Sequence, residues 1–131
     1  MKCIIFFLLT LAAVLPALAQ KQRFNILTYG AKGDGKTDNT SFIQHAIDDA
    51  SAASGGVVSI PAGRFLSGVL HFRSGVELHL ADKAVLLASA RRSDYGGTPA
   101  SAFLVATDQQ HIAITGKGTI DGNGRELLKD I

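Results

Sequence analysis

Short apolar runs separated by glycine, proline and aspartate dominate the chain beyond residue 56. The clearest run is 76–80, in which Val76, Leu78 and Leu80 alternate with polar residues, as in a strand with one buried face. The other short apolar runs predict further strands at 57–60, 69–72, 85–88, 103–105, 112–115 and 119–120. No helical pattern separates these strands, which excludes ordinary βαβ units and leaves a sandwich or a solenoid.

The N-terminal part of the chain has a different pattern. A strand is predicted at 24–29, a glycine-rich turn at 30–37 and a helix at 39–54. Asp38 is the expected N-cap, because its carboxylate can accept from the free amides of the first turn. The apolar residues of the helix fall on one arc of a 3.6-residue wheel, and they are Phe42, Ile43, Ala46, Ile47, Ala50 and Ala53. A helix with one apolar face is expected to cover another element.

The strand spacing favours the solenoid. Val57 and Val76 are 19 residues apart, Val69 and Val85 are 16 apart, and Phe103 lies 27 beyond Val76. A recurrence near twenty residues is typical of one coil of a parallel β-helix. The predicted fold is therefore an all-β solenoid, a right-handed single-stranded parallel β-helix of two to three coils with an N-terminal capping helix.

The two ends of the predicted solenoid are not equivalent. A stack of repeats needs covered ends to be stable. The helix at 39–54 would cover the N-terminal end, whereas no segment up to Ile131 has the pattern of a second cap. We therefore expect residues 20–131 to be the N-terminal coils of a longer β-helix domain.

The first nineteen residues have the pattern of an export signal. A basic start precedes an apolar run from Cys3 to Leu15, which is too short for an ordinary transmembrane helix. Ala17-Leu18-Ala19 supplies the small residues of a cleavage site. We expect residues 1–19 to be a signal peptide cleaved near Ala19-Gln20, and the product to be secreted or periplasmic and free of the membrane.

Composition narrows the chemistry. The single cysteine, Cys3, lies in the leader, so the mature chain would have neither disulfides nor thiolate metal sites. A formal net charge of +2 over 131 residues is not the signature of a nucleic-acid-binding protein. Asp34 and Asp38 lack the alternating oxygen ligands of a calcium loop and are explained as a turn residue and a cap. No metal, cofactor or nucleic-acid partner is expected.

One motif points elsewhere. Residues 30–37 read Gly-Ala-Lys-Gly-Asp-Gly-Lys-Thr, a literal G-x-x-x-x-G-K-T between a strand and a helix, as in a phosphate-binding P-loop. The helix-flanked parallel strands of a nucleotide-binding sheet do not follow it. Asp38 would also place a negative charge at the helix N-terminus, where a phosphate should bind. We therefore interpret the motif as a glycine turn that leads into the helix, and a nucleotide binder as the remote alternative.

Three stretches together carry a family resemblance. The opening Tyr29-Gly30-Ala31-Lys32-Gly33-Asp34-Gly35-Lys36-Thr37-Asp38 looks like that of pectin-lyase-like β-helix proteins. Residues 68–80, and the glycine-rich Ile112-Ala113-Ile114-Thr115-Gly116-Lys117-Gly118-Thr119-Ile120-Asp121-Gly122-Asn123-Gly124, more specifically resemble polygalacturonases. The resemblance implies a secreted glycoside hydrolase that cleaves galacturonan or rhamnogalacturonan linkages with inversion. Its substrate would be pectic polysaccharide or oligogalacturonide.

The motifs that carry this chemistry in the family are not found in the chain. The resemblance implies one carboxylic acid that protonates the leaving oxygen and a second carboxylate that activates water. Asp48-Asp49 falls on the predicted helix, and Asn39-Thr40 is followed by Ser41 rather than aspartate. No catalytic residue is therefore assigned here. The catalytic aspartates are expected downstream of Ile131, and the chain alone is expected to be inactive.

Arg91 and Arg92 are the candidate substrate-binding residues. They lie in an irregular stretch between strands, and a guanidinium group suits the carboxylate of a uronate. An ordinary solvated loop would have the same composition. Two further functions remain open, a lyase or epimerase relative on the same fold and a non-catalytic carbohydrate-binding β-helix.

Overall fold

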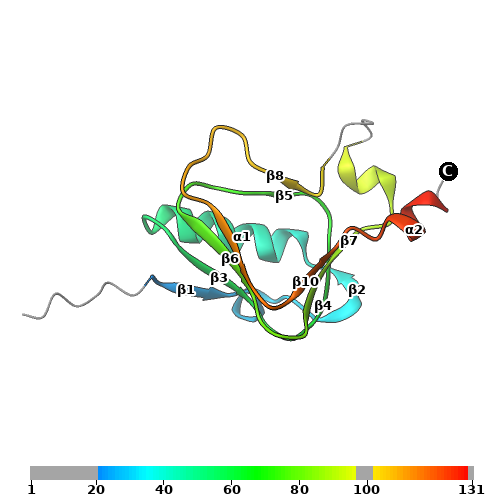
Figure 1. Ribbon diagram of the computed structural model, residues 1–131, viewed down its shortest axis with the longest axis horizontal. Helices are drawn as coiled ribbons and strands as arrows, with labels where there is room; N and C mark the ends of the chain where they lie inside the picture. Colours follow the sequence, from blue (N-terminus) through cyan, green and yellow to red (C-terminus); the bar gives the residue numbers. More distant parts are fainter. Residues whose placement is uncertain (1–20, 97–101, 130–131) are drawn as a thin grey trace, which may run out of the picture.

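The computed structural model describes residues 21–96 and 102–129, which form a stack of short strands with one long helix alongside (Figure 1). The predicted signal peptide at 1–19 lies outside the described residues. The strands are β1 (Arg23–Asn25), β2 (Asp34–Asp38), β3 (Gly56–Ile60), β4 (Gly63–Ser67), β5 (Leu70–His71), β6 (Val76–Leu80), β7 (Ala84–Ala88), β8 (Leu104–Val105), β9 (Ala113–Gly116) and β10 (Thr119–Asp121). The helices are α1 (Thr40–Ala52) and α2 (Gly124–Leu128), with 3-10 turns η1 (Ile26–Tyr29) and η2 (Arg92–Tyr95).

Three parallel sheets form the sides of the stack. Sheet A has the order β1-β3-β6-β9, sheet B has β10-β7-β4-β2, and sheet C has β5-β8. The chain visits the sheets in turn, so that β3, β4 and β5 make one complete coil and β6, β7 and β8 make the next. Every pairing is parallel. This is the predicted right-handed parallel β-helix.

The register gives the true repeat. Gly56 pairs with Val76, twenty residues on, and Gly63 pairs with Ala84, twenty-one residues on. Leu70 pairs with Leu104, because the third coil is longer and includes η2. The predicted recurrence near twenty residues therefore holds in sheets A and B between the two complete coils, whereas the other pairings span 28 to 36 residues. The particular match of Val69 with Val85 was wrong, because these residues belong to different sides of the coil.

Inward side chains of successive coils stack into one core. Val76, Leu78 and Leu80, the residues of the alternating strand, are all buried as predicted. Leu78 lies in register with Val58 on sheet A, and the pairing of β4 with β7 brings their buried side chains together on sheet B in the same way. The largest fully buried apolar side chains are Phe65, Ile26, Ile43, Ile47, Ile60, Leu70, Leu78, Leu86, Val58 and Val76.

Several elements differ from the prediction. The first strand ends at Asn25, because the side chain of Asn25 accepts from the Leu27 amide and starts η1. The glycine-rich turn contains strand β2, whose sequence Asp-Gly-Lys-Thr-Asp has no apolar residue to reveal it. Strand β4 was missed because Phe65 is its only core-facing large apolar residue, and the short helix α2 was missed as well.

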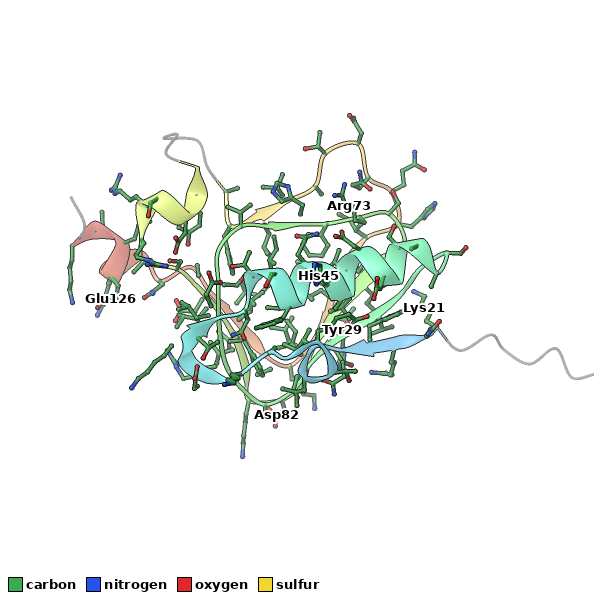
Figure 2. The ribbon with its side chains drawn as sticks, turned by 180° about the vertical axis from the view of Figure 1, so that it is seen from behind. Lys21, Tyr29, His45, Arg73, Asp82 and Glu126 are labelled. Carbon is green, nitrogen blue, oxygen red and sulfur yellow. The ribbon has the colours of Figure 1, made fainter. Side chains whose placement is uncertain are left out.

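Helix α1 lies where predicted and buries most of the expected arc. Ile43, Ala46, Ile47 and Ala50 are buried, whereas Phe42 is half-buried and Ala53 is exposed beyond the last turn. The N-cap is Asn39 rather than Asp38, although Asp38 Oδ1 does accept from the first-turn amide of Thr40 at 2.9 Å. Tyr29 lies beside the helix (Figure 2), and its hydroxyl donates to Asp49 Oδ2 at 2.7 Å. Burial and this carboxylate raise the pKa of Tyr29 to about 12.

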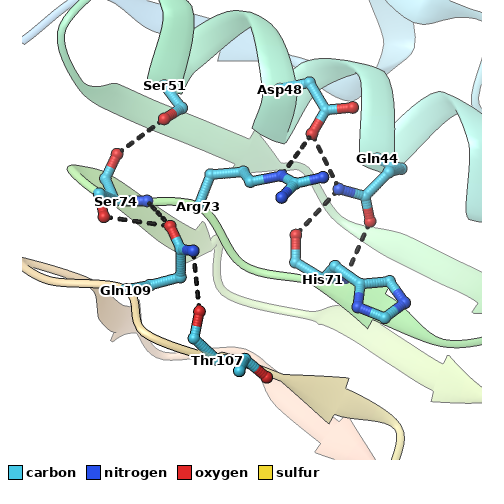
Figure 3. Close-up of polar contacts among 8 residues, drawn as sticks. All are labelled: Gln44, Asp48, Ser51, His71, Arg73, Ser74, Thr107 and Gln109. Carbon is cyan, nitrogen blue, oxygen red and sulfur yellow. Dashed lines mark hydrogen bonds and ion pairs between the residues drawn. The ribbon is translucent and has the colours of Figure 1, made fainter.

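Helix α1 takes the place of a third strand in the first coil and runs beside β5. Gln44 Nε2 donates to the His71 carbonyl at 2.9 Å, and Gln44 Oε1 accepts from the His71 amide at 2.8 Å (Figure 3). Thr40 Oγ1 accepts from the Gly68 amide, and Ser51 Oγ donates to the Ser74 carbonyl. Side chains of α1 thus make the hydrogen bonds that a neighbouring strand would make, which closes this edge of sheet C.

The last coil is open by contrast. Strands β9 and β10 lie at the outer edges of sheets A and B, and all four residues of β9 are exposed. Apolar side chains on this face are Ile112 at 38%, Ile114 at 50% and Ile120 at 38% exposure. The N-terminal end of the described stack is covered by a helix, and the opposite end presents isoleucines and strand edges.

Candidate functional site

A pocket of about 380 Å³ lies on the outside of sheet B, where β2, β4 and β7 end. Its floor comes from Leu66 and Leu87, which are in register on neighbouring strands. Their sequence neighbours Phe65 and Leu86 point into the core, so these leucines point outward. Leu87 is nevertheless only 7% exposed, because the walls of the pocket cover it. The pocket has an apolar floor under a polar rim, the usual construction of a small-molecule site.

Arg91, one of the two predicted substrate-binding residues, forms part of the rim. Its Nε lies 3.2 Å from Asp94 Oδ2, and its amide donates to Ser89 Oγ at 3.1 Å. Ser89 is only 4% exposed, and its hydroxyl donates to Asp94 Oδ2. The Arg91 side chain is therefore held at Nε and through its backbone, while 73% of it remains exposed to solvent.

The 3-10 turn η2 carries this wall of the pocket. The Tyr95 hydroxyl donates to the Ser89 carbonyl at 2.5 Å, and the Ser89 amide donates to the Ser67 carbonyl at 2.9 Å. Burial, and secondarily the charge of Asp94, raises the pKa of the Tyr95 hydroxyl above its ordinary value. Ser89 thus joins η2 to sheet B. No sequence pattern predicted a role for Ser89, because that role consists of hydrogen bonds to Ser67 on β4 and to Asp94 and Tyr95 in η2.

Strand β2 supplies the opposite wall with Lys36 and Asp38. The ion pairs found among the described residues do not include the Lys36 ammonium group. Asp38 Oδ1 accepts from the amide and the hydroxyl of Thr40, at 2.9 and 2.5 Å. Asn123, after β10, completes the rim and donates from its side chain to the Ala88 carbonyl at 3.1 Å.

The loop that resembles a phosphate-binding motif is filled by its own carboxylate. Asp34 Oδ1 accepts from the amides of Lys36 and Thr37 at 2.9 and 2.8 Å, and Asp34 Oδ2 accepts from the Thr37 hydroxyl at 2.7 Å. The Thr37 and Lys36 amides, with the Thr37 hydroxyl, lower the pKa of Asp34 to about 2. The amides that a P-loop offers to phosphate are therefore occupied by a permanent anion. This finding supports rejection of a nucleotide site, and the occupying carboxylate is that of Asp34, whereas Asp38 accepts from Thr40 at the start of α1.

Asn39 holds the same segment from its buried side, a role that the sequence did not predict. It is fully buried, its Oδ1 accepts from the Lys32 amide at 2.8 Å, and its Nδ2 donates to the carbonyls of Lys32 and Thr37, each at 3.0 Å. The two Lys32 groups precede β2 and the Thr37 carbonyl lies within it, so Asn39 fixes the segment that carries Lys36. A buried asparagine with three backbone partners is a positioning residue for the pocket wall.

The remaining candidates are dispersed. Arg92 lies in η2 and is not part of the pocket lining. Asp48 forms an ion pair with Arg73 at 3.3 Å, and Asp49 accepts a hydrogen bond from Tyr29. Both aspartates therefore attach α1 to neighbouring segments. No group of three or more histidine, cysteine, aspartate or glutamate side chains with metal-binding geometry occurs within residues 21–96 and 102–129. Over the same ranges, no helix has the length and apolar character needed to cross a bilayer.

Comparison with known proteins identifies the relatives of this fold. Residues 23–79 match the family described as "Rhamnogalacturonase A/epimerase, pectate lyase-like". The exo-poly-alpha-D-galacturonosidase of Dickeya chrysanthemi is 42% identical over 125 residues, which cover 81% of this chain and 20% of that protein. A shorter segment of 42 residues, 32% of this chain and 5% of the relative, is 55% identical to alginate lyase 7 of Azotobacter vinelandii.

The solved structures agree with the sequence comparison. The family 28 exopolygalacturonase of Yersinia enterocolitica superposes with a TM-score of 0.71 and 40% sequence identity, over 80% of this chain and 21% of that one. The chain thus spans about a fifth of the length of the galacturonan-directed relatives that it matches.

Proposed function

We infer that this chain belongs to the polygalacturonases, a family of pectin-lyase-like β-helix proteins, and we infer its function from that family. We propose that the chain supplies the N-terminal coils of an exported glycoside hydrolase that cleaves galacturonan or rhamnogalacturonan linkages. The single observation that carries the proposal is 42% identity to the Dickeya exo-poly-alpha-D-galacturonosidase over 125 residues, a match longer than any one coil.

The proposed reaction is inverting hydrolysis. It needs one carboxylic acid to protonate the leaving oxygen and a second carboxylate, about 6.5–9.5 Å away, to activate water. Asp34, Asp48 and Asp49 are all engaged in hydrogen bonds or ion pairs with the loop and helix around them. We therefore propose that the catalytic aspartates are supplied by residues beyond Ile131, as the sequence predicted.

A second reaction on the same fold is favoured by one observation. The 55% identity to alginate lyase 7 over 42 residues is higher than the identity to the galacturonan-directed relatives, although the segment is short. The alternative is a lyase or an epimerase that acts on another polyuronate. It requires a different set of catalytic residues from that of a hydrolase, again outside the described ranges.

The test is to read the gene beyond the codon for Ile131 and to assay the encoded protein on polygalacturonate. A hydrolase releases reducing ends without forming a double bond, and the anomeric configuration of the first product shows inversion. An unsaturated product identifies a lyase, and conversion of mannuronate to guluronate residues in polymannuronate identifies an epimerase. Either of these results, without hydrolysis, would overturn the proposal.

Export is part of the proposal. Residues 1–19 are proposed to be a signal peptide cleaved near Ala19-Gln20, which would deliver the enzyme to a polysaccharide outside the cytoplasm. The mass of the secreted protein tests this directly, because cleavage there gives a chain that begins at Gln20 and lacks Cys3. A secreted product that retains Met1 would contradict the cleavage.

A further inference from the structure

We propose that the pocket on the outside of sheet B is a binding site for one uronate residue, with Arg91 and Lys36 as its carboxylate-binding groups. The inference rests on the proposed function, because it takes its ligand class from the pectic substrate. It goes further by placing a sugar-binding subsite on the N-terminal coils themselves, and by naming the residues that form it.

The rim chemistry fits a ligand that carries one carboxylate and several hydroxyl groups. Arg91 is fixed through Nε by Asp94, which leaves the two terminal nitrogens of its guanidinium group directed away from that bond. A guanidinium group anchored in this way can present a two-pronged donor to a carboxylate. Lys36 adds a second positive charge from the opposite wall, and Asp38 adds a carboxylate that can accept from sugar hydroxyl groups.

The floor fits the apolar face of a sugar ring. Leu66 and Leu87 are adjacent on neighbouring strands, about 5 Å apart in a sheet, which matches the width of one ring rather than of an extended chain. The volume of about 380 Å³ is also large enough for a single monosaccharide unit, and it lies in the range of small-molecule sites. One uronate residue is therefore the expected occupant.

The site is built before any ligand arrives. Ser89, nine-tenths buried and hydrogen-bonded to Asp94 and to the Arg91 amide, holds one wall. Asn39, fully buried, holds the loop that carries Lys36 on the other wall. The backbone of both walls is thus held by buried polar residues, so that little ordering of the walls remains to occur on binding.

The test is equilibrium binding of trigalacturonate to the full chain, with the neutral trisaccharide of galactose as the matched ligand. We expect Arg91→Ala to weaken binding about tenfold or more, because one charge-assisted interaction is lost. Lys36→Ala is expected to weaken binding less, and Arg91→Lys to fall between Arg91→Ala and the unaltered chain. Arg23→Ala, on the outside of sheet A, is the control and is expected to leave binding unchanged. Circular dichroism melts confirm that each variant folds.

Trigalacturonate binding that is unchanged in both Arg91→Ala and Lys36→Ala would overturn the site. It would leave the proposed pectin-directed function untouched, because the sugar would then bind elsewhere. A folded chain that binds no uronate oligomer would also overturn it, while release of reducing ends by the longer protein would independently uphold the hydrolase. Binding of trimannuronate in place of trigalacturonate, lost in Arg91→Ala, would support the site and contradict the pectic substrate.

Discussion

The first and last coils of the described stack are both end coils, but only the first is covered by another element. Both lie at the ends of sheets A and B, where backbone groups and apolar side chains lack a neighbouring coil. At the first coil, α1 covers the core with Ile43, Ile47 and neighbouring alanines, and Gln44 pairs with the backbone of β5. At the last coil, Ile114 is 50% exposed. The comparison shows that a β-helix end is closed by side-chain hydrogen bonds as well as by apolar cover.

The largest effect is expected where the last coil is attached to the one before it. Gly116 has φ of +100°, and a Cβ at this position would lie 1.9 Å from the Leu80 carbonyl oxygen. We expect Gly116→Ala to lower the free energy of unfolding by about 3 kcal/mol, through a steric clash and a strained backbone. Urea denaturation measures the loss. Gly122→Ala is the matched control, because open space surrounds Gly122. Equal stability of the two variants would contradict the turn geometry.

The next effect concerns the closed end. Gln44→Ala removes both hydrogen bonds to the His71 backbone and opens an edge of sheet C. We expect a loss of about 1–2 kcal/mol in the free energy of unfolding. We also expect concentration-dependent association, because a free strand edge pairs readily with another chain. Thermal melts and sedimentation velocity measure these effects. Ser41→Ala, an exposed position on the same helix, is expected to change neither quantity.

A smaller effect on stability, but a clear one on solubility, is expected at the open end. We expect poor solubility or partial unfolding of residues 20–131 in isolation, because the last coil exposes apolar side chains. Ile114→Lys is expected to reduce light scattering on concentration, while the free energy of unfolding stays within about 0.5 kcal/mol. Leu27 is also 50% exposed but lies in η1, so Leu27→Lys serves as the control. Equal improvement from both variants would show that the open face is not the source of association.

The smallest effect is a pH dependence in the first coil. The pKa of Asp34 is about 2 in the folded chain, against an ordinary 3.8, so the ionised form is favoured by folding. The stabilisation it gives is complete above the unfolded pKa and is lost as the pH falls through about 2. Melting temperatures of the unaltered chain and of Asp34→Asn are expected to converge between pH 4 and pH 2. A difference that is constant over this range would exclude Asp34 as the titrating group.

The elements that could be predicted are those whose own sequence has a clear pattern of apolar and polar residues. Strand β6 alternates strictly and was placed correctly, as was α1 from its apolar arc. Strand β2 is entirely polar and is held by pairing with β4 and by the Asn39 side chain, so nothing local reveals it. The match between strands of successive coils also could not be read from spacing alone, because coils of different length interrupt the repeat.

The site was predictable to a lesser extent. Arg91 was selected for its charge and its place in an irregular stretch, and it does line a pocket. Its partner in that pocket, Lys36, lies 55 residues earlier and was assigned to a turn. Ser89 and Asn39 hold the backbone near Arg91 and Lys36. Such contacts cannot be predicted from a pattern of residues in the sequence. Parallel pairing brings such distant residues together, so the pocket appears only when the register is known.

The register also sets an order of assembly. Between the two complete coils, the pairings in sheets A and B join residues twenty and twenty-one positions apart, whereas the pairing in sheet C, Leu70 with Leu104, spans thirty-four. Arg23 with Val57 and Val85 with Thr119 also span thirty-four positions. Closing the shorter loops costs about 0.5 kcal/mol less entropy for each pairing. We expect the nucleus of folding to be the two middle coils, on which the first strand and the last coil condense afterwards. In this order of assembly the solenoid is expected to grow outward from the centre in both directions.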